Sequence, residues 1–474
     1  MSNVVVVPAP DGPPLHELAA ALPDAAWPAL FDGGPDAHGF AQWDMLACDP
    51  VATLSLTGSD DPLPAPGERA WGRLASAIRA EFGDVPSDGQ DEMPAVGDGA
   101  DGASDLPPFR GGAVVTAAYD LGRECERLPC VLPRDADLPD LAAGIYRYAL
   151  AERRSDGRRV IVGRGSEQGA RAFGRRLSLA ALDVRPAGGL PVAGDPVSSL
   201  SREAYLAAVA DVREHIRDGD LYQVNLAQRW QLPWEGRAAD LQRLLRRTSP
   251  APFGMCLRTP RFALVSSSPE LFLRRRGQQV TSCPIKGTRP RGADAASDAR
   301  LRHELETDPK EVAELSMIVD LVRNDLGRSA LTGSVAVELP FATDAWSTVF
   351  HRVATVTARV ASELPTSTLI ERAWPPASVT GTPKLAALAL IEELEPVRRH
   401  LYTGATGWID AAGDCDLSVN IRVATAVDGR LLVPFGGGIT LASDPQAEYD
   451  ETLHKAAGLF AALGIERDVV LGAS

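Results

Sequence analysis

The chain has 474 residues, 45% of them hydrophobic and 23% charged, an ordinary globular composition that allows a sizeable core. A formal net charge of −15 and a pI near 5.0 exclude a surface built for nucleic acid or for an anionic membrane, since either needs a basic stripe. The longest basic run, at residues 274–276, is typical of a solvated strand or loop face.

The N-terminal sequence MSNVVVVPAPDGPP has no charged start and only a four-residue apolar run, so it is not a signal peptide. No uninterrupted apolar stretch approaches the roughly 18 residues that span a bilayer. The six cysteines form no Cys-x-x-Cys pair and are few for this length, which favours reduced thiols over a disulfide frame or a zinc site. We therefore expect a cytoplasmic protein without membrane or nucleic-acid partners.

Residues 1 to about 80 alternate short apolar runs with Gly, Pro and Asp, which predicts strands and turns more than long helices. Residues 84–108 are acidic and rich in Gly and Pro, typical of a flexible insertion. A strand is expected where β-branched residues follow FRGG. A second change of composition at 186–196 indicates a linker, so the sequence predicts an α+β region at 1–195 and a second region at 196–474.

The second region begins with a helix from Ser201 to about Arg217, a turn at 218–220 and the alternating strand LYQVNLAQRW. Long helices then alternate with antiparallel strands, and no repeat of fixed period occurs. This mixture predicts an α+β fold with layered antiparallel sheets flanked by helices.

Two predicted helices each begin with Asp-Pro and carry two carboxylates three residues apart. In the first, Asp308 is the predicted N-cap, and a glutamate at the third helical position suggests a capping box. In the second, Lys455 follows four residues after the last glutamate. The four glutamates are Glu311, Glu314, Glu448 and Glu451. Such pairs suit Mg²⁺, but they are also what two solvated helix faces look like.

Three further features have both a functional and an ordinary interpretation. The glycines of PFGGGIT, Gly436, Gly437 and Gly438, predict either a backbone anion site or a tight turn. The turn SVTGTPK leads into a helix whose N-terminus could hold an anion. In the strand LSVNIRVAT, Arg422 is expected on one face with Asn420 and Ala424, either with an anionic partner or at a solvated edge.

Histidine is scarce, and His351 lies in an apolar stretch typical of a core histidine. The chain lacks GxSxG, HExxH, a Walker loop and a GxGxxG before a helix, the signatures of serine hydrolases, zincins, P-loop NTPases and Rossmann dehydrogenases.

Taken in order, nine motifs resemble the chorismate-utilising enzymes, and within them the synthase components of aminodeoxychorismate synthases. The motifs are GDLYQVNLAQR, SSSPELF, CPIKGTRPRG, DPKEVAELSMIVDLVRNDLGR, PPASVTGTPK, YTGATGWID, NIRVAT, GGGIT and AEYDETLHKA. The resemblance runs from Ser201 to the end of the chain. It implies that residues 196–474 form a chorismate-binding catalytic region.

Two positions distinguish activities within this family. Aminodeoxychorismate synthases carry PIKGT, as at Lys286, whereas anthranilate synthases carry PIAGT. Isochorismate and salicylate synthases have a lysine general base where this chain has Asn225. The resemblance therefore implies amination of chorismate to 4-amino-4-deoxychorismate, on the route to p-aminobenzoate and folate.

The resemblance also implies a role for each matched residue. Lys286 is the nucleophile that attacks ring carbon 2, Glu270 the acid that protonates the leaving hydroxyl, and His351 a secondary group near the ring. Substrate carboxylates would be bound by Thr380, Gly381, Tyr402, Arg422, Gly436, Gly437, Gly438 and Lys455. Magnesium would be held by Glu314 and Glu451, with Glu311 and Glu448 as outer partners.

No glutamine amidotransferase segment is visible, so ammonia is expected from a separate glutaminase subunit or from solution. In the N-terminal region, residues 43–50 resemble one wall of the family's tryptophan pocket. Three alternatives stay open: an anthranilate synthase component I, a relative in a specialised pathway, and a non-catalytic sensor. Oligomeric state and tryptophan binding are not predicted.

Overall fold

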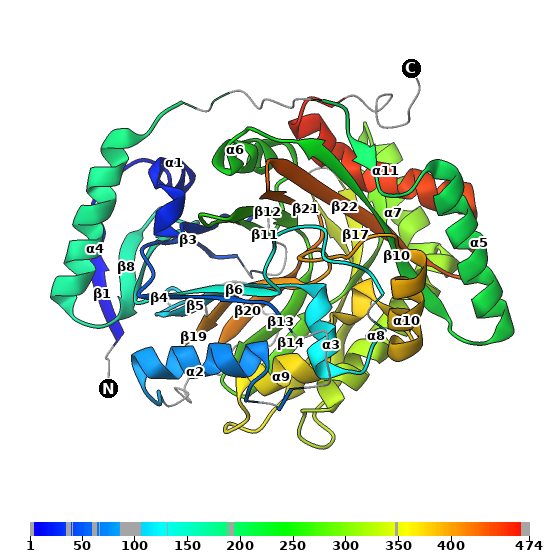
Figure 1. Cartoon of the computed structure of the whole chain (residues 1–474), viewed down its shortest axis with the longest axis horizontal. Coiled ribbons are helices and arrows are strands. Elements are labelled where there is room, and N and C mark those ends of the chain that lie inside the picture. Colours follow the sequence, from blue (N-terminus) through cyan, green and yellow to red (C-terminus); the bar gives the residue numbers. More distant parts are fainter. Residues whose placement is uncertain are drawn as a thin grey trace.

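Two large sheets stack face to face in the computed structural model, and helices cover their outer faces (Figure 1). The structure describes residues 4–465 apart from 35–38, 40, 59–63, 66, 86–105, 130, 187, 189–193, 347 and 348. The predicted insertion at 84–108 therefore lies almost wholly outside the described residues. All the strand pairs described are antiparallel, which confirms the predicted α+β class with layered antiparallel sheets.

The first sheet has the order β1-β8-β7-β3-β2-β11-β12-β21-β22-β10-β18, with β9 paired to β10. Its strands are β1 Val4–Pro8, β2 Ala29–Phe31, β3 Trp43–Ala47, β7 Tyr148–Arg153, β8 Arg159–Arg164, β9 Val197–Ser198, β10 Gln223–Pro233, β11 Phe253–Arg258, β12 Phe262–Ser268, β18 Gly381–Thr382, β21 Val423–Val427 and β22 Arg430–Ile439.

The second sheet has the order β15-β17-β14-β13-β20-β19-β5-β6-β4, with β16 paired to β17. Its strands are β4 Ala52–Leu56, β5 Gly112–Ala117, β6 Leu141–Tyr146, β13 Leu271–Arg276, β14 Gln279–Cys283, β15 Ile285–Pro290, β16 Ala336–Ala345, β17 Val349–Arg359, β19 Ala405–Asp410 and β20 Cys415–Val419. Both sheets draw strands from either side of residue 195, so the two regions of the sequence share their sheets. The boundary itself stays a prediction.

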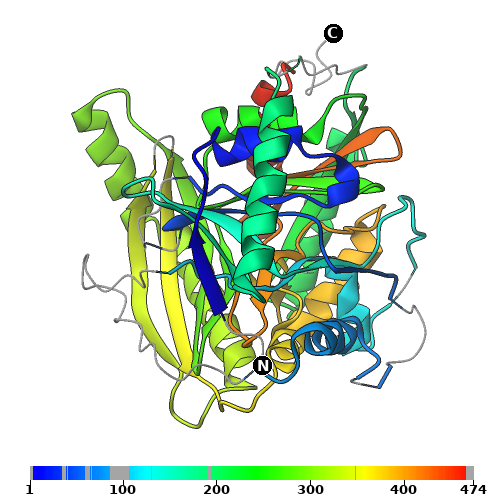
Figure 2. The same cartoon turned by 90° about the vertical axis from the view of Figure 1, so that its left-hand side faces the viewer.

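The helices form the two outer layers. They are α1 Leu15–Ala21, α2 Ala70–Phe82, α3 Gly122–Cys125, α4 Glu167–Ala180, α5 Arg202–Asp218, α6 Ala238–Thr248, α7 Ala295–Thr307, α8 Pro309–Gly327, α9 Thr366–Ala373, α10 Lys384–Leu394 and α11 Pro445–Ala462, with short 3₁₀ turns η1 Asp24–Ala26, η2 Tyr119–Leu121, η3 Ala181–Asp183 and η4 Ala377–Val379. α4 lies along β1 and β8 (Figure 2), and α5, α10 and α11 cover β10 and β22. No helix in the described part of the chain is long and apolar enough to cross a membrane.

Helix starts follow the sequence rules closely. The Ser201 hydroxyl accepts a hydrogen bond from the Ala204 amide at 3.1 Å and caps α5, and α8 and α11 begin directly after Asp308 and Asp444 as predicted. The first 80 residues contain more helix than expected, because α2 begins at Ala70 and buries Trp71 and Leu74 against the second sheet.

A buried ion pair fixes the strand that crosses the site. Arg399 donates to Glu395 through Nε at 2.8 Å and to the Asn225 carbonyl of β10 at 2.6 Å, while the Ala227 amide donates to Glu395 Oε1 at 2.9 Å. Arg399 Nη1 also reaches the Val379 carbonyl of η4 at 2.8 Å. The pair therefore joins β10 to η4.

Removing one partner of this pair is expected to be costly. Glu395→Ala would leave the Arg399 guanidinium buried without its carboxylate, and we expect the free energy of unfolding to fall by about 3–5 kcal/mol. Urea unfolding measures this loss. Glu304→Ala, which breaks the exposed Arg300–Glu304 pair, should change stability by no more than about 1 kcal/mol. Equal effects of the two substitutions would contradict this prediction.

Candidate active site

The Lys286 amine lies where the second sheet meets the 3₁₀ turn η4. Lys286 is on β15, opposite Arg352 of β17, and the strand bulges immediately after it at Gly287, whose φ is +81°. Its Nζ donates a hydrogen bond to the Ser378 carbonyl at 3.0 Å. Burial lowers the pKa of Lys286, the Glu314 carboxylate opposes this shift, and the ammonium of Lys455 adds to it. A lower pKa increases the fraction of neutral amine, the form that can act as a nucleophile.

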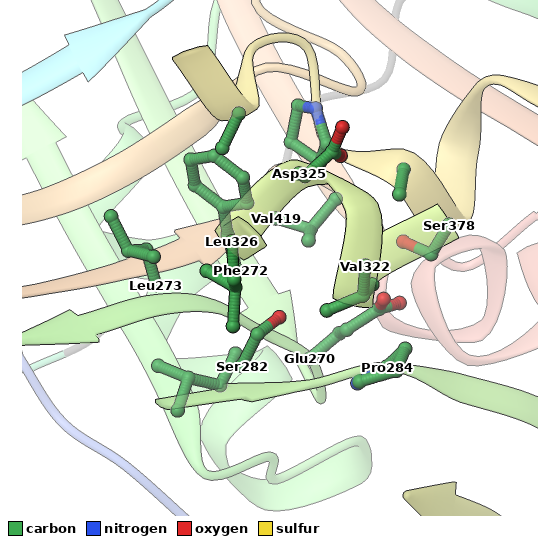
Figure 3. A pocket seen from close by; sticks show the side chains of 14 residues that line it. Glu270, Phe272, Leu273, Ser282, Pro284, Val322, Asp325, Leu326, Ser378 and Val419 are labelled. Atoms are coloured by element: carbon green, nitrogen blue, oxygen red, sulfur yellow. The ribbon is translucent and has the colours of Figure 1, made fainter. Parts of the chain in front are cut away.

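The Glu270 carboxyl is beside the same turn. Glu270 lies between β12 and β13, is 3% exposed, and accepts hydrogen bonds from the Ser378 hydroxyl and the Ile285 amide. Burial raises the pKa of Glu270 to about 7, against the opposing effects of Ser378 and Lys286. Ser378 thus connects the acid and the amine, one through its hydroxyl and the other through its carbonyl. Figure 3 shows Glu270 and Ser378 side by side.

His351 and Arg422 form a second polar pair. Arg422 Nη2 lies 3.2 Å from His351 Nε2, and His351 Nδ1 lies 2.9 Å from Thr288 Oγ1. Because a guanidinium can only donate, His351 Nε2 is the acceptor and Nδ1 carries the proton. Burial and the neighbouring Arg422 hold the pKa of His351 well below its usual range, so the imidazole is neutral. Burial also lowers the pKa of Arg422 to about 10.

The strand predicted at 417–425 is wrong at its centre. β20 ends at Val419 and β21 begins at Val423, and Arg422 between them has a φ of +51° in the left-handed region. Its side chain therefore does not follow the alternation of a continuous strand. This backbone turn directs Arg422 to His351.

Helix α8 brings Glu314 to the site and places the Glu311 carboxylate beside Gly287, where it pairs with Arg289. Glu314 is buried, and burial raises its pKa to about 7. Glu311 Oε1 accepts a hydrogen bond from Arg289 at 3.1 Å, and Asp308 Oδ2 accepts another from Arg289 at 2.9 Å. Asp308 caps the helix through the Lys310 amide at 2.9 Å. The N-cap prediction is confirmed, whereas the Glu311 carboxylate pairs with Arg289 in place of the predicted capping box.

Helix α11 brings two carboxylates and an ammonium to the same place. Lys455 Nζ lies 2.7 Å from Glu451 Oε1, and this ion pair lowers the pKa of Glu451 to about 2. The same ammonium donates to the Gly436 carbonyl at 2.9 Å. Glu448 is buried, and its Oε1 lies 2.8 Å from Lys310 Nζ. Lys310 Nζ is also 3.7 Å from Glu314 Oε1. A lysine thus lies between glutamates of the two helices.

Among the residues described, no three carboxylate, thiol or imidazole groups are already gathered as metal ligands. Lys310 occupies the space between Glu314 and Glu448. The sequence did not single out Lys310, although its place two residues after Asp308 in the first Asp-Pro helix offered a signal.

The three glycines are part of a strand, so the tight turn, one of their two interpretations, is wrong. β22 continues through them, and Asn225 and Ala227 of β10 pair with Gly438 and Gly436. A Cβ added at Gly437 would stand 3.5 Å from Glu448 Oε2 and 4.0 Å from Glu451 Oε1. Because glycine has no side chain, the carboxylates and the lysines lie directly beside the backbone of this strand.

Two of the proposed binding residues, Thr380 and Gly381, make their contacts within the protein. Thr380 Oγ1 donates to the Ala377 carbonyl at 2.9 Å, and Gly381 pairs with Val224 of β10. Tyr402 belongs to a buried apolar cluster with Val423, and burial raises the pKa of its hydroxyl. Ser378, which the sequence analysis quoted only within its motif, has the more direct contacts with Lys286 and Glu270.

Residues 35–461 match the model of a family described as chorismate binding enzyme. The chain belongs to this family. Aminodeoxychorismate synthase component 1 of Escherichia coli is 35% identical over 433 residues, covering 90% of this chain and 91% of the relative. Anthranilate synthase component 1 of Thermus thermophilus is 40% identical over 370 residues, covering 76% and 79%.

Solved structures of chorismate-binding enzymes have the same fold. Anthranilate synthase component I of Streptococcus pneumoniae superposes with a TM-score of 0.73 at 26% identity, covering 88% of this chain and 92% of that one. The menaquinone-specific isochorismate synthase of Escherichia coli gives a TM-score of 0.72 at 17% identity, covering 98% and 95%. The family assignment confirms the resemblance read from the nine motifs.

Close contacts with charged side chains make Gly438 a sensitive position. A Cβ there would stand 3.4 Å from both Glu314 Oε2 and Lys286 Nζ, and closer still to the Gln223 amide. We expect Gly438→Ala to lower kcat/KM for chorismate about 10²-fold by displacing these groups. Gly327→Ala adds a methyl group to open space at the end of α8 and should leave turnover unchanged. Wild-type turnover of Gly438→Ala would contradict the placement of this strand in the site.

Proposed function

We propose that this chain aminates chorismate to 4-amino-4-deoxychorismate with ammonia, using Lys286 as a covalent nucleophile. The observation that carries the proposal is the contact of the Lys286 amine with Ser378, whose hydroxyl in turn binds the Glu270 acid. A buried amine of lowered pKa beside a carboxyl of raised pKa is the pair that nucleophilic displacement of a hydroxyl requires.

The first step forms a covalent adduct. The neutral Lys286 amine attacks ring carbon 2, the double bond shifts, and the carbon 4 hydroxyl leaves as water with the proton of Glu270. In the second step ammonia attacks carbon 4, the double bond shifts back, and the Lys286 amine departs. The new ammonium group returns a proton to the Glu270 carboxylate, which restores the acid. Chorismate and ammonia are thereby converted to aminodeoxychorismate and water.

Arg422 is the group best suited to bind a substrate carboxylate. It lies against a neutral imidazole, and no carboxylate of the described residues forms an ion pair with it. A guanidinium held in this way has donors left for a bidentate carboxylate contact. Lys455 is the second candidate, since its ammonium reaches the backbone of the glycine strand.

The carboxylates of α8 and α11 fit Mg²⁺ in their chemistry. Glu314 and Glu448 already hold the ammonium of Lys310, and Glu451 lies beside the same strand, so the site attracts positive charge. Oxygen ligands of this kind are those that Mg²⁺ prefers. When bound, the ion would neutralise a substrate carboxylate. Glu311, held by Arg289, would be an outer partner.

Lys310 competes with such an ion for Glu314 and Glu448. We expect Lys310→Met to raise the affinity for Mg²⁺ about tenfold or more, because a unit charge a few Å away contributes over about 1 kcal/mol at an effective dielectric constant near 20. Calorimetric titration of the protein with Mg²⁺ in the absence of chorismate measures this. Arg323→Met removes an exposed charge from the same helix and is the control. Unchanged affinity in Lys310→Met would contradict the competition.

Anthranilate synthesis is the second candidate, because relatives with that name are as similar as 40% identical. Lys286 favours amination at carbon 4, since an amine occupies the position from which ammonia would otherwise attack carbon 2. Asn225 in place of a lysine base speaks against hydration to isochorismate. The relatives' designation as component 1 supports a separate glutaminase subunit as the ammonia source, and the product would enter folate synthesis or a specialised pathway.

Product analysis tests the proposal. The purified chain is incubated with chorismate, Mg²⁺ and ammonium, and the product is identified by mass spectrometry and comparison with authentic standards. We expect aminodeoxychorismate without release of pyruvate. Anthranilate would overturn the proposal in favour of the second candidate, and binding without turnover would favour a chorismate sensor.

A further inference from the structure

A small cavity beside Glu270 is lined by residues of β13, β14, α8 and η4 (Figure 3). Glu270 and Ser378 line it at the side of the site, and Asp325 lines it farther along α8. Asp325 Oδ2 is 2.7 Å from Lys384 Nζ, so its charge is already compensated. Side chains such as Val322 and Val419 make most of the remaining wall apolar.

The size and lining of the cavity restrict what it can hold. Its volume for the centre of a water-sized molecule is about 20 Å³, slightly more than the 10–15 Å³ that one water molecule needs. Among the described residues that line it there is no arginine, lysine or histidine, so nothing there would bind a carboxylate. Chorismate is excluded on both grounds. A single small uncharged molecule fits.

The position of the cavity relates it to one atom of the substrate. In the proposed reaction Glu270 gives its proton to the hydroxyl on carbon 4, so its carboxyl would face that carbon, and Glu270 also lines the cavity. Ammonia must later reach carbon 4 from a direction that the lysine adduct leaves open. Lys286, whose Nζ donates to the Ser378 carbonyl, is not among the described residues that line the cavity.

We infer that this cavity holds ammonia next to Glu270 and delivers it to carbon 4, an inference that rests on the proposed amination. Ammonia adds to carbon 4 as a neutral molecule, the C–N bond to Lys286 breaks, and the electron pair returns to the lysine amine. The nitrogen bound to carbon 4 then passes one proton to the adjacent Glu270 carboxylate. Ala377 and Val322 shape the cavity and are specificity residues for the nucleophile.

Narrowing the cavity tests the inference. Ala377→Val and Val322→Ile each add apolar volume to the wall, and the control Ala358→Val adds the same volume as Ala377→Val to the same core away from the cavity. We expect both cavity variants to need about tenfold more ammonium for half-maximal turnover, since one methylene in a fitted pocket changes discrimination about 10–200-fold. In both cavity variants the lysine adduct, measured without ammonium by intact-protein mass, should form at the wild-type rate. In the control Ala358→Val, both the ammonium dependence of turnover and the rate of adduct formation should match the wild type.

Widening the cavity provides a second test, in which no added side-chain volume has to fit into the packed core. Val322→Ala should allow methylamine to replace ammonia, giving a 4-methylamino product that the wild-type protein does not form. Unchanged ammonium dependence in the narrowed variants, or adduct formation that falls in parallel with turnover, would overturn the inference. Failure of the wild-type protein to form any adduct would instead contradict the proposed function itself.

Discussion

Lys286→Ala is expected to abolish covalent catalysis and to lower the rate of chorismate amination by on the order of 10³-fold or more, the scale at which loss of a nucleophile acts in other enzymes. The alanine variant retains Glu270, Arg422 and the glutamate helices, so chorismate should still bind. Steady-state rates with saturating ammonium, together with a binding measurement for chorismate, separate the two effects.

Lys286→Arg is the matched control for charge. It keeps a cation at the same place on β15 but removes the nucleophilic amine, because a guanidinium stays protonated in proteins. If Lys286 acts by its charge, the arginine variant should recover much of the activity. If Lys286 acts as a nucleophile, arginine should be as inactive as alanine, and near wild-type turnover in either variant would refute covalent catalysis.

Glu270→Gln is expected to lower turnover about 10²–10⁴-fold, the usual contribution of a general acid. It should also change the pH profile in a defined way. Glu270 acts in its protonated form, and burial raises its pKa to about 7, so the wild-type rate should fall as the pH rises through that value. Lys286 must be neutral to act, and burial lowers its pKa, so its titration makes the rate rise with pH.

The glutamine variant should lose only the falling limb of this profile. Glu392→Gln is a suitable control, because Glu392 is a buried carboxyl outside the site that pairs with Arg123. It should lower stability and leave the shape of the profile unchanged. A falling limb near pH 7 that persists in Glu270→Gln would assign the acid to another group.

Local rules explain which parts of the fold were predictable. The helices after Ser201, Asp308 and Asp444 begin where a side chain caps the first turn, which depends on neighbours in the sequence alone. Strand β10 was also predictable from its own sequence, because its alternating residues are typical of a strand. Prediction from local pattern was therefore sufficient to place Glu314, Glu448 and Glu451 on their helices.

Long-range pairing explains where prediction failed. Gly436 to Gly438 favour a turn locally, yet β10 pairs with them along its length and keeps them in a strand. The break of the chain at Arg422 has no local signal, since arginine is not a residue that favours a left-handed conformation.

Two contacts of the site also lay beyond the sequence. Glu311 pairs with Arg289, which strand β15 brings to it. The Ser378 carbonyl that positions Lys286 is a backbone group, and backbone groups leave no trace in side-chain patterns. Residues that act through the main chain are those that only the fold reveals.

The most direct test of the account is the intact mass of the protein after mixing with chorismate and Mg²⁺ in the absence of ammonia. The account predicts a species heavier by chorismate less one water, attached to Lys286 as located by peptide mapping, and discharged on addition of ammonium to give aminodeoxychorismate. Amination at the wild-type rate with no such species at any time, and with Lys286→Ala fully active, would contradict it.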